Sequence, residues 1–197
     1  MDKLIIDELK REFIDAAKRA YNTGIQTGTG GNISVRISGE DMMLIKPSGI
    51  SFTDCTMDNI ILTTLDGQVI EGDGKPSREA YLHREIYKLN NNINSIVHCH
   101  APWSIAWSLR EKVLDTITQH AKLKLVNQIP VIDIIKPVIT EDEIDKILCY
   151  YTNNTVLKAF LLKGHGIVAV GDKVRETEYL AELIEETAQI SCIDRIM

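Results

Sequence analysis

The chain has 197 residues, of which 44% are hydrophobic and 25% charged, an ordinary composition for a globular protein. This length predicts one domain over residues 1–197, with a core large enough to need no disulfides. The formal net charge of −6 excludes general binding to nucleic acid or to an anionic membrane, because both require a surplus of basic residues.

The four cysteines are scattered and form no CxxC pair, which is typical of reduced thiols in the cytoplasm. The first eight residues carry too many charges for a signal peptide, and no apolar run approaches the length of a membrane span. We therefore expect a cytoplasmic protein with no membrane segment.

The N-terminal part predicts a helix followed by a glycine-rich turn. Residues 3–21 have apolar side chains at helical spacing, and Gly24 is placed to end that helix. The glycines within residues 27–32 can point successive N–H groups into one concavity, which suits a phosphate group. A plain turn before the predicted strand at 33–37 explains the same glycines.

The next elements predict an antiparallel meander. Residues 42–46 form a predicted strand that ends at Pro47-Ser48-Gly49, where a hydroxyl and a close backbone approach are available. Asp66-Gly67 lies between β-prone runs at 60–65 and 68–70, which is a strong hairpin signal.

A helix is predicted over about residues 78–90, with Ser77 as its N-cap and Glu79 in its first turn. Glu79 and His83 are four residues apart and could share a face as a metal-binding pair. An acid near the positive end of a helix and a buried structural histidine explain them equally well. We expect His83 to be structural.

The segment Asn94–Pro102 contains two histidines on a predicted strand. Because strand side chains alternate, His98 and His100 should point to one face and Cys99 to the other. Two adjacent imidazoles can hold two corners of a metal coordination sphere, although two partly exposed histidines would give the same pattern.

The remaining elements alternate between helices and strands. Residues 103–109 predict a helix with Trp103 and Leu109 buried, and residues 129–135 predict a strand. Thr140–Glu143 reads as a capping box, and Asp172 as the cap of a final helix.

His165 lies between Gly164 and Gly166, in a predicted turn between strands at 156–162 and 167–170. The two glycines expose this histidine to a group that approaches closely, although an ordinary hairpin histidine would show the same pattern. Together with His98 and His100, it would complete three neutral imidazoles, which leave one position of a tetrahedral metal open, as catalytic zinc sites do. A Lewis acid, a carboxylate at Glu79 and nearby anion donors indicate chemistry at a sugar-phosphate carbonyl.

Five motifs occur in the order and spacing of one known family: Thr29-Gly-Gly-Asn-Ile-Ser34, Lys46-Pro-Ser-Gly49, Lys75-Pro-Ser-Arg-Glu79, His98-Cys-His100 and Lys163-Gly-His-Gly166. On these motifs the chain resembles the class II aldolase/adducin family over nearly its whole length. The resemblance implies an α/β fold, a three-layer α/β/α sandwich with a mainly antiparallel central sheet. It also implies a homotetramer with active sites between neighbouring subunits.

The resemblance further implies that His98, His100 and His165 bind one Zn²⁺ per subunit and that Glu79 is the catalytic acid/base. The residues it implies for phosphate and substrate binding are Thr29, Gly30, Gly31, Asn32, Ser48, Gly49, Ser77 and Arg78. The implied reaction is reversible cleavage of a ketose 1-phosphate to dihydroxyacetone phosphate and an aldehyde, with the metal instead of a Schiff-base lysine as electron sink.

Three alternatives accompany this reading. A pentulose-5-phosphate 4-epimerase is similar but usually has aspartate where Glu79 stands, and a methylthioribulose-phosphate dehydratase would keep the metal. A non-enzymatic adducin-like interaction domain lacks the full histidine set. The resemblance also implies a tyrosine proton donor on a C-terminal tail, which the sequence up to Met197 does not contain. It further implies an aromatic residue after the segment 98–109, where the sequence reads Thr118-Gln-His-Ala121, and His120 is the candidate substitute for that aromatic residue.

Overall fold

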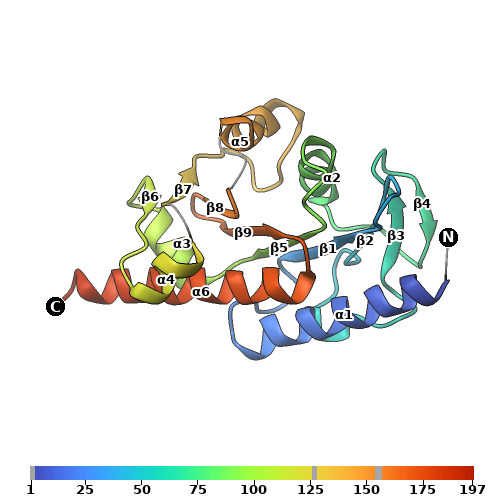
Figure 1. Ribbon diagram of the computed structural model, residues 1–197, viewed down its shortest axis with the longest axis horizontal. Coiled ribbons are helices and arrows are strands. Elements are labelled where there is room, and N and C mark those ends of the chain that lie inside the picture. Colours follow the sequence, from blue (N-terminus) through green and yellow to red (C-terminus); the bar gives the residue numbers. More distant parts are fainter. Residues whose placement is uncertain (1–2, 126–127, 154–156) are drawn as a thin grey trace.

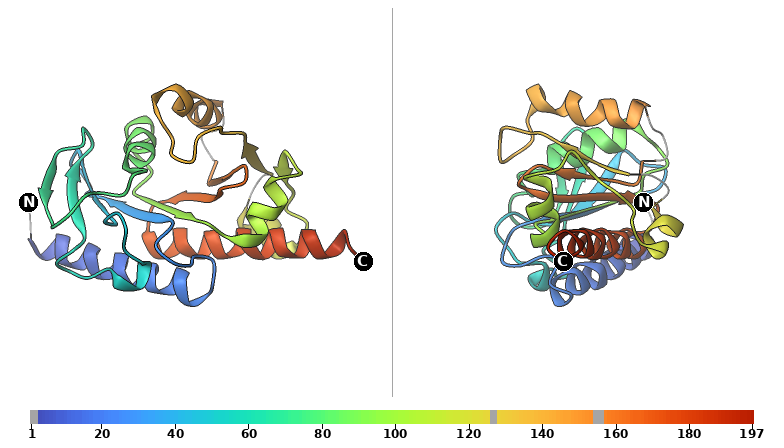
Figure 2. Two further views of the ribbon diagram at one scale, coloured as in Figure 1. Left: turned by 180° about the vertical axis from the view of Figure 1, so that it is seen from behind. Right: turned by 90° about the vertical axis from the view of Figure 1, so that its left-hand side faces the viewer.

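The computed structural model describes residues 3–125, 128–153 and 157–197, which form three layers around one sheet (Figure 1). Helices α1 (Lys3–Asn22) and α6 (Val174–Asp194) cover one face, and α2 (Ala80–Leu89) and α5 (Glu141–Asn153) cover the other. The right-hand view of Figure 2 shows these layers end on. The predicted α/β/α sandwich is confirmed.

The central sheet has nine strands in the order β4-β3-β2-β1-β5-β9-β8-β7-β6. All neighbouring strands pair antiparallel except β7 and β8, which are parallel. The strands are β1 Asn32–Arg36, β2 Met42–Ile45, β3 Ile61–Thr64, β4 Val69–Glu71, β5 Ser95–Cys99, β6 Val113–Leu114, β7 Ile129–Ile132, β8 Ala159–Leu162 and β9 Gly166–Gly171. Shorter helical segments are η1 Phe52–Asp54, α3 Pro102–Ser108 and α4 Gln119–Lys124.

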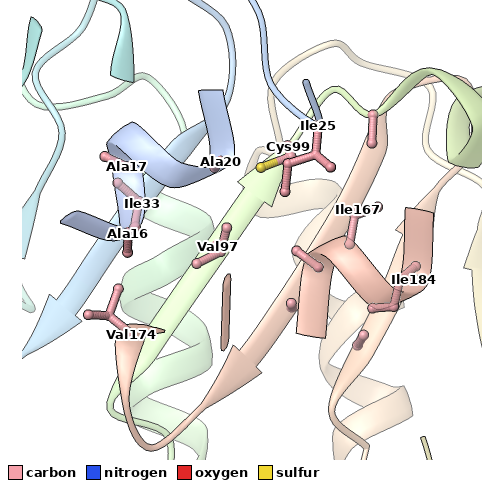
Figure 3. Close-up of a cluster of buried hydrophobic side chains, with 14 of the residues drawn as sticks. Ala16, Ala17, Ala20, Ile25, Ile33, Val97, Cys99, Ile167, Val174 and Ile184 are labelled. Carbon is pink, nitrogen blue, oxygen red and sulfur yellow. The ribbon is translucent and has the colours of Figure 1, made fainter. Parts of the chain in front are cut away.

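Each face of the sheet has its own apolar core, because successive strand side chains point to opposite sides. In β5, Val97 and Cys99 pack with α1 and α6, while Ile96 packs with α2 and α5. Figure 3 shows the first of these cores, with Val97 and Cys99 beside the alanines of α1. His98 follows Ile96 onto the α2 face and Cys99 points to the opposite face, and this alternation is what the sequence pattern predicted.

The predicted Asp66-Gly67 hairpin is confirmed. Thr63 pairs with Val69, and the Gln68 carbonyl accepts a 2.8 Å hydrogen bond from the Thr64 amide. β4 forms an edge of the sheet with Val69 and Ile70 exposed. Among the described helices, none is both long enough and apolar enough to cross a membrane.

Two predicted helix starts were wrong by one or two residues. α2 begins at Ala80, so Glu79 occupies the N-cap position (φ −95°, ψ 13°) and Ser77 precedes it, with its Oγ accepting a 3.3 Å hydrogen bond from the Glu79 amide. Lys173 is the N-cap residue of α6. The Asp172 carboxylate instead accepts a 2.7 Å hydrogen bond from Asn94.

The predicted buried face of the helix at 103–109 was also wrong. Trp103 and Leu109 are 37% and 59% exposed, whereas Ser104 and Trp107 face inward. The reason is Glu185 on α6, whose carboxylate accepts hydrogen bonds from the backbone of Trp103 and from both the backbone and hydroxyl of Ser104. These hydrogen bonds orient α3 so that Ser104 faces α6.

Two further predictions differ in detail. Glu143 does not close a capping box with Thr140; it accepts hydrogen bonds from the Ile135 and Lys136 amides in the preceding loop. Strand β7 ends at Ile132, three residues earlier than expected. Val156, the predicted first residue of the following strand, lies outside the described residues.

Candidate active site

Three imidazoles and one carboxylate converge at one end of the central strands. His98 belongs to β5, His100 follows it, His165 lies in the turn between β8 and β9, and Glu79 precedes α2. The ring centroids are 5.0 Å apart for His98–His100, 4.8 Å for His98–His165 and 4.9 Å for His100–His165. One ligand atom from each of the four residues lies within 4.8 Å of the others, so they could hold a metal ion.

The orientation of His98 is fixed by the strand next to it. Its Nδ1 donates a 2.8 Å hydrogen bond to the Ile167 carbonyl, which leaves the Nε2 lone pair free. Complete burial lowers the pKa of His98 from 6.5 to about 3, so the ring is neutral near pH 7. Nε2 then faces Glu79 Oε2 at 3.2 Å, an arrangement of two acceptors that a shared proton or a cation would stabilise.

The buried polar atoms around this point fit a metal ion. His98 Nε2, His100 Nε2, His165 Nδ1 and Glu79 Oε1 are buried without a hydrogen-bond partner among the described residues. Burial also lowers the pKa of His100, and it lowers that of His165 to about 4, which keeps both rings in the neutral form that ligates metals. Three imidazole nitrogens favour zinc or a similar transition ion over magnesium or calcium.

His165 reaches this cluster because glycine follows it. Gly166 has φ +150°, and a Cβ there would lie 2.1 Å from the Cys99 carbonyl oxygen. The turn between β8 and β9 can therefore lie directly against the end of β5. On the other side of His165, the Gly164 amide donates a 2.9 Å hydrogen bond to Ser108 Oγ on α3.

His100 is held by the segment that leads into the glycine-rich turn. Gln26 is buried, and its Oε1 accepts a 2.8 Å hydrogen bond from the His100 amide while its Nε2 donates at 2.6 Å to the Thr27 carbonyl. A Cβ on Gly30 would lie only 2.6 Å from His100 Nδ1, so this turn packs against the imidazole. Sequence patterns gave no signal for Gln26, because its partner is 74 residues away.

Glu79 is 6% exposed and is held from the neighbouring strand. Asn32, directly opposite His98 in the pairing of β1 with β5, donates a 2.7 Å hydrogen bond from Nδ2 to Glu79 Oε2. The Asn32 Oδ1 atom is buried without a partner among the described residues. Asn32 was expected to bind phosphate, and the structure places its amide nitrogen on the carboxylate.

The expected anion-binding loops lie next to each other. Pro47 and Pro76 form an antiparallel bridge, in which the Ser48 amide donates to the Lys75 carbonyl at 2.8 Å and the Ser77 amide to the Lys46 carbonyl at 3.0 Å. The bridge sets Ser48 opposite Lys75 and Ser77 opposite Lys46, so the two loops lie side by side, as an anion site formed by both loops requires.

Lys46 joins these loops to the glycine-rich turn. Its side chain is buried, and its Nζ donates to the carbonyls of Thr29, Pro47 and Ile50 at 3.3, 3.2 and 2.7 Å. Burial lowers the pKa of this ammonium group. The outer surface formed by the joined loops is open, because Thr29, Ser48, Gly49 and Arg78 are exposed. The sequence suggested no such role for Lys46.

Two other histidines lie outside the cluster formed by Glu79, His98, His100 and His165. His83 is buried, and its Nδ1 shares a 2.6 Å hydrogen bond with Ser34 Oγ, in agreement with the structural reading. His120 is exposed at the start of α4, where the Thr118 hydroxyl caps the helix by accepting a hydrogen bond from the Ala121 amide.

Comparisons with known proteins agree on one family. The family model described as "Class II Aldolase and Adducin N-terminal domain" matches residues 11–192. The chain is 31% identical to an L-fuculose phosphate aldolase of Methanococcus maripaludis, over 92% of this chain and 95% of that protein. It is 28% identical to a 3-oxo-tetronate 4-phosphate decarboxylase of Escherichia coli, over 92% of this chain and 85% of that protein.

A solved structure gives the same result in three dimensions. The L-fuculose-1-phosphate aldolase from Thermus thermophilus superimposes with a TM-score of 0.82 at 28% sequence identity, covering 95% of this chain and 94% of that one.

Proposed function

The chain belongs to the class II aldolase and adducin family, and from this premise we propose that it is a zinc-dependent aldolase acting on a ketose 1-phosphate similar to L-fuculose 1-phosphate. The products would be dihydroxyacetone phosphate and an aldehyde. The family membership and the likeness to L-fuculose-1-phosphate aldolase, both suggested by the motifs, are confirmed. Since its relatives are class II aldolases, the chain is an enzyme, and the adducin-like alternative is set aside.

One observation carries the proposal: a complete three-histidine and one-carboxylate cluster lies beside three joined loops rich in backbone and hydroxyl donors. We propose that His98, His100 and His165 hold the metal, one Zn²⁺ per subunit. When bound there, a divalent metal supplies Lewis-acid stabilisation for negative charge that develops on the ketose oxygens.

Glu79 is the proposed acid/base. In the cleavage direction a base accepts the proton of the C4 hydroxyl, and the C3–C4 bond breaks. The aldehyde leaves, and the electron pair stays on the ketone fragment. Glu79, acting as the carboxylic acid, then gives its proton to that carbon and becomes the carboxylate; in condensation the carboxylate removes the same proton. The hydrogen bond from Asn32 to Oε2 supports this role, since it fixes the carboxylate while Oε1 stays available.

The phosphate is proposed to bind at the joined loops. The candidate donors are the backbone and hydroxyl groups of Thr29, Gly30, Gly31, Ser48, Gly49 and Ser77, together with the Arg78 side chain. The buried Lys46 ammonium, whose described partners are neutral carbonyls, adds positive charge beneath this surface. Asn32 would contribute through its free oxygen, which suits a substrate hydroxyl better than a phosphate oxygen because it accepts hydrogen bonds.

We also propose a cytoplasmic homotetramer of single-domain subunits, with active sites between neighbours and with neither nucleic acid nor membrane as partner. The exposed outer surface of the phosphate loops supports this assembly, since a neighbouring subunit could complete the site there. Light scattering coupled to size-exclusion chromatography tests it directly, and a monomer would contradict it.

The function is tested by incubating the zinc-loaded protein with L-fuculose 1-phosphate, L-rhamnulose 1-phosphate and 5-deoxyribulose 1-phosphate and measuring dihydroxyacetone phosphate. Release from at least one substrate, abolished by a chelator and restored by zinc, is the expected result. A metal-loaded protein that releases none would overturn the proposal.

The decarboxylase relative gives a second candidate, because loss of carbon dioxide from a 3-oxo acid leaves the same kind of carbanion next to a carbonyl. Carbon dioxide release from 3-oxo-tetronate 4-phosphate, without cleavage of any ketose 1-phosphate, would favour it. Assays for pentulose-5-phosphate epimerisation and methylthioribulose-phosphate dehydration complete the panel.

A further inference from the structure

A line of polar contacts joins β1 to α2 in a layer that is otherwise apolar. Alternate residues of β1 meet residues spaced one helical turn apart on α2. Asn32 bonds Glu79, and Ser34 Oγ lies 2.6 Å from His83 Nδ1 and 2.7 Å from Tyr87 Oη. At the far end, Arg36 donates a 3.0 Å hydrogen bond to the Tyr87 carbonyl.

The middle of this line is fully buried, since Ser34, His83 and Tyr87 are each 0% exposed. On either side of it, Leu82 and Ile86 pack into the apolar core beneath α2. Burying hydroxyl and imidazole groups is unfavourable unless they are bonded, so apolar side chains would attach the helix equally well. What the polar groups add is direction, because hydrogen bonds tolerate only narrow ranges of distance and angle.

We propose that Ser34, His83 and Tyr87 form a buried clamp that positions Glu79 for proton transfer. The three residues would fix the rotation of α2 and its place along β1, so that Asn32 can hold Glu79 Oε2 next to His98. They are positioning residues that act through Glu79, and the inference rests on the proposed role of Glu79 as acid/base.

The helix transmits this constraint over a short distance. His83 is one turn after Glu79, with its amide donating to the Glu79 carbonyl at 3.4 Å, and Tyr87 is one turn further. A slide of α2 by one residue would move the carboxylate by about 1.5 Å. Misplacement of a reacting group by about 1 Å can lower a rate by about 100-fold.

The first test is Ser34→Ala in the zinc-loaded full-length protein, which removes the hydroxyl shared by His83 and Tyr87. We expect kcat to fall by about 10- to 100-fold, while KM and zinc content stay within about twofold of wild type. Tyr87→Phe, which removes only the outer link, should give a smaller loss in the same direction. An unchanged kcat in Ser34→Ala would overturn the proposal.

Ile86→Val and Ile86→Ala are the matched controls, since Ile86 lies on the same helix in the same layer but outside the clamp. We expect Ile86→Val to lower the melting temperature less than Ser34→Ala does, and Ile86→Ala to lower it more. Both variants should keep kcat near the wild-type value. If they lower kcat as much as Ser34→Ala at equal melting temperature, the effect is general destabilisation and the clamp is refuted.

A double-mutant cycle tests whether the clamp acts through Glu79. In the Glu79→Gln protein, Ser34→Ala should leave the residual turnover unchanged. A further loss by the same factor as in wild type would show that the two residues act independently, against the proposal.

Hydrogen exchange separates failure of the clamp from failure of the proposed function. The amides of residues 79–83 should exchange faster in Ser34→Ala than in the Ile86 variants, whether or not the protein turns over a ketose phosphate. Faster exchange in a protein that cleaves no ketose phosphate would refute the function and leave the clamp supported. Equal exchange would refute the clamp.

Discussion

Replacing Gly30 with alanine tests whether the glycine-rich turn sets the position of His100, a proposed metal ligand. A Cβ at this residue would lie 2.6 Å from His100 Nδ1 and 2.9 Å from its Cε1. The Gly30 backbone does not have a positive φ, so alanine is compatible with it. The added methyl group is therefore opposed mainly by the imidazole, with Gln26 Nε2 at 3.2 Å as a further close contact.

The structure gives the size of the effect. Ordinary contacts begin near 3.4 Å, so the ring must retreat by about 0.8 Å, the difference between this separation and 2.6 Å. Metal–ligand distances are held to within about 0.2 Å, so His100 would no longer ligate in its present place. We expect zinc affinity to fall by about 10- to 100-fold, equivalent to about 1.4–2.7 kcal/mol.

Zinc affinity can be measured by competition with a chromophoric chelator, alongside the melting temperature of the metal-free protein. Gly28→Ala in the same turn is the control: its φ of +60° makes alanine strained, but no atom lies within 4 Å of the added Cβ. It should lose about 1–2 kcal/mol of stability and keep its zinc affinity. The reasoning fails if Gly30→Ala binds zinc as tightly as wild type, or if Gly28→Ala loses as much affinity.

Three further predictions concern Glu79, Glu185 and the buried His83. Glu79→Gln should keep its zinc and lower kcat by about 100- to 10,000-fold, because the amide cannot take the proton; unchanged turnover would remove Glu79 from its role. Glu185→Gln should lower the free energy of unfolding by about 1–3 kcal/mol in urea titration, since it weakens the charge-assisted bonds that hold α3, and equal stability would contradict this. The metal-free protein should lose stability as the pH falls from 6.5 towards 3, because burial lowers the pKa of His83 to about 3 and the unfolded chain takes up the proton first. A urea midpoint that is the same at about pH 7 and about pH 5 would refute it.

Local sequence patterns predicted much of the geometry of the cluster formed by Glu79, His98, His100 and His165. Strand alternation placed His98 and His100 on one face, and the glycines around His165 indicated a close approach that Gly166 indeed makes to Cys99. These inferences needed only the geometry of one strand and one turn. The resemblance of the motifs to a known family then implied that His98, His100, His165 and Glu79 belong to one site.

The residues that hold this cluster in place could not be predicted in the same way. Gln26 and Lys46 act through backbone partners in other loops, and Ser34 bonds residues about fifty positions away. Periodicity shows which face a residue occupies, but not which side chain meets it there. For the same reason the buried face of α3 was predicted wrongly, because Glu185 on a distant helix decides it.

Strand β1 has opposite chemistry on its two faces, and this has a consequence for how accurately the sheet assembles. Ile33 and Val35 pack into the core under α1 and α6, while Asn32 and Ser34 face α2. A slip of one residue against β5 would exchange the two faces. The slip would bury the polar groups of β1 in the core under α1 and α6 without partners, at a cost of about 1–3 kcal/mol each. It would also place the apolar side chains of β1 against the polar residues of α2. The polar groups that are proposed to serve the chemistry thus also penalise mispaired strands during folding.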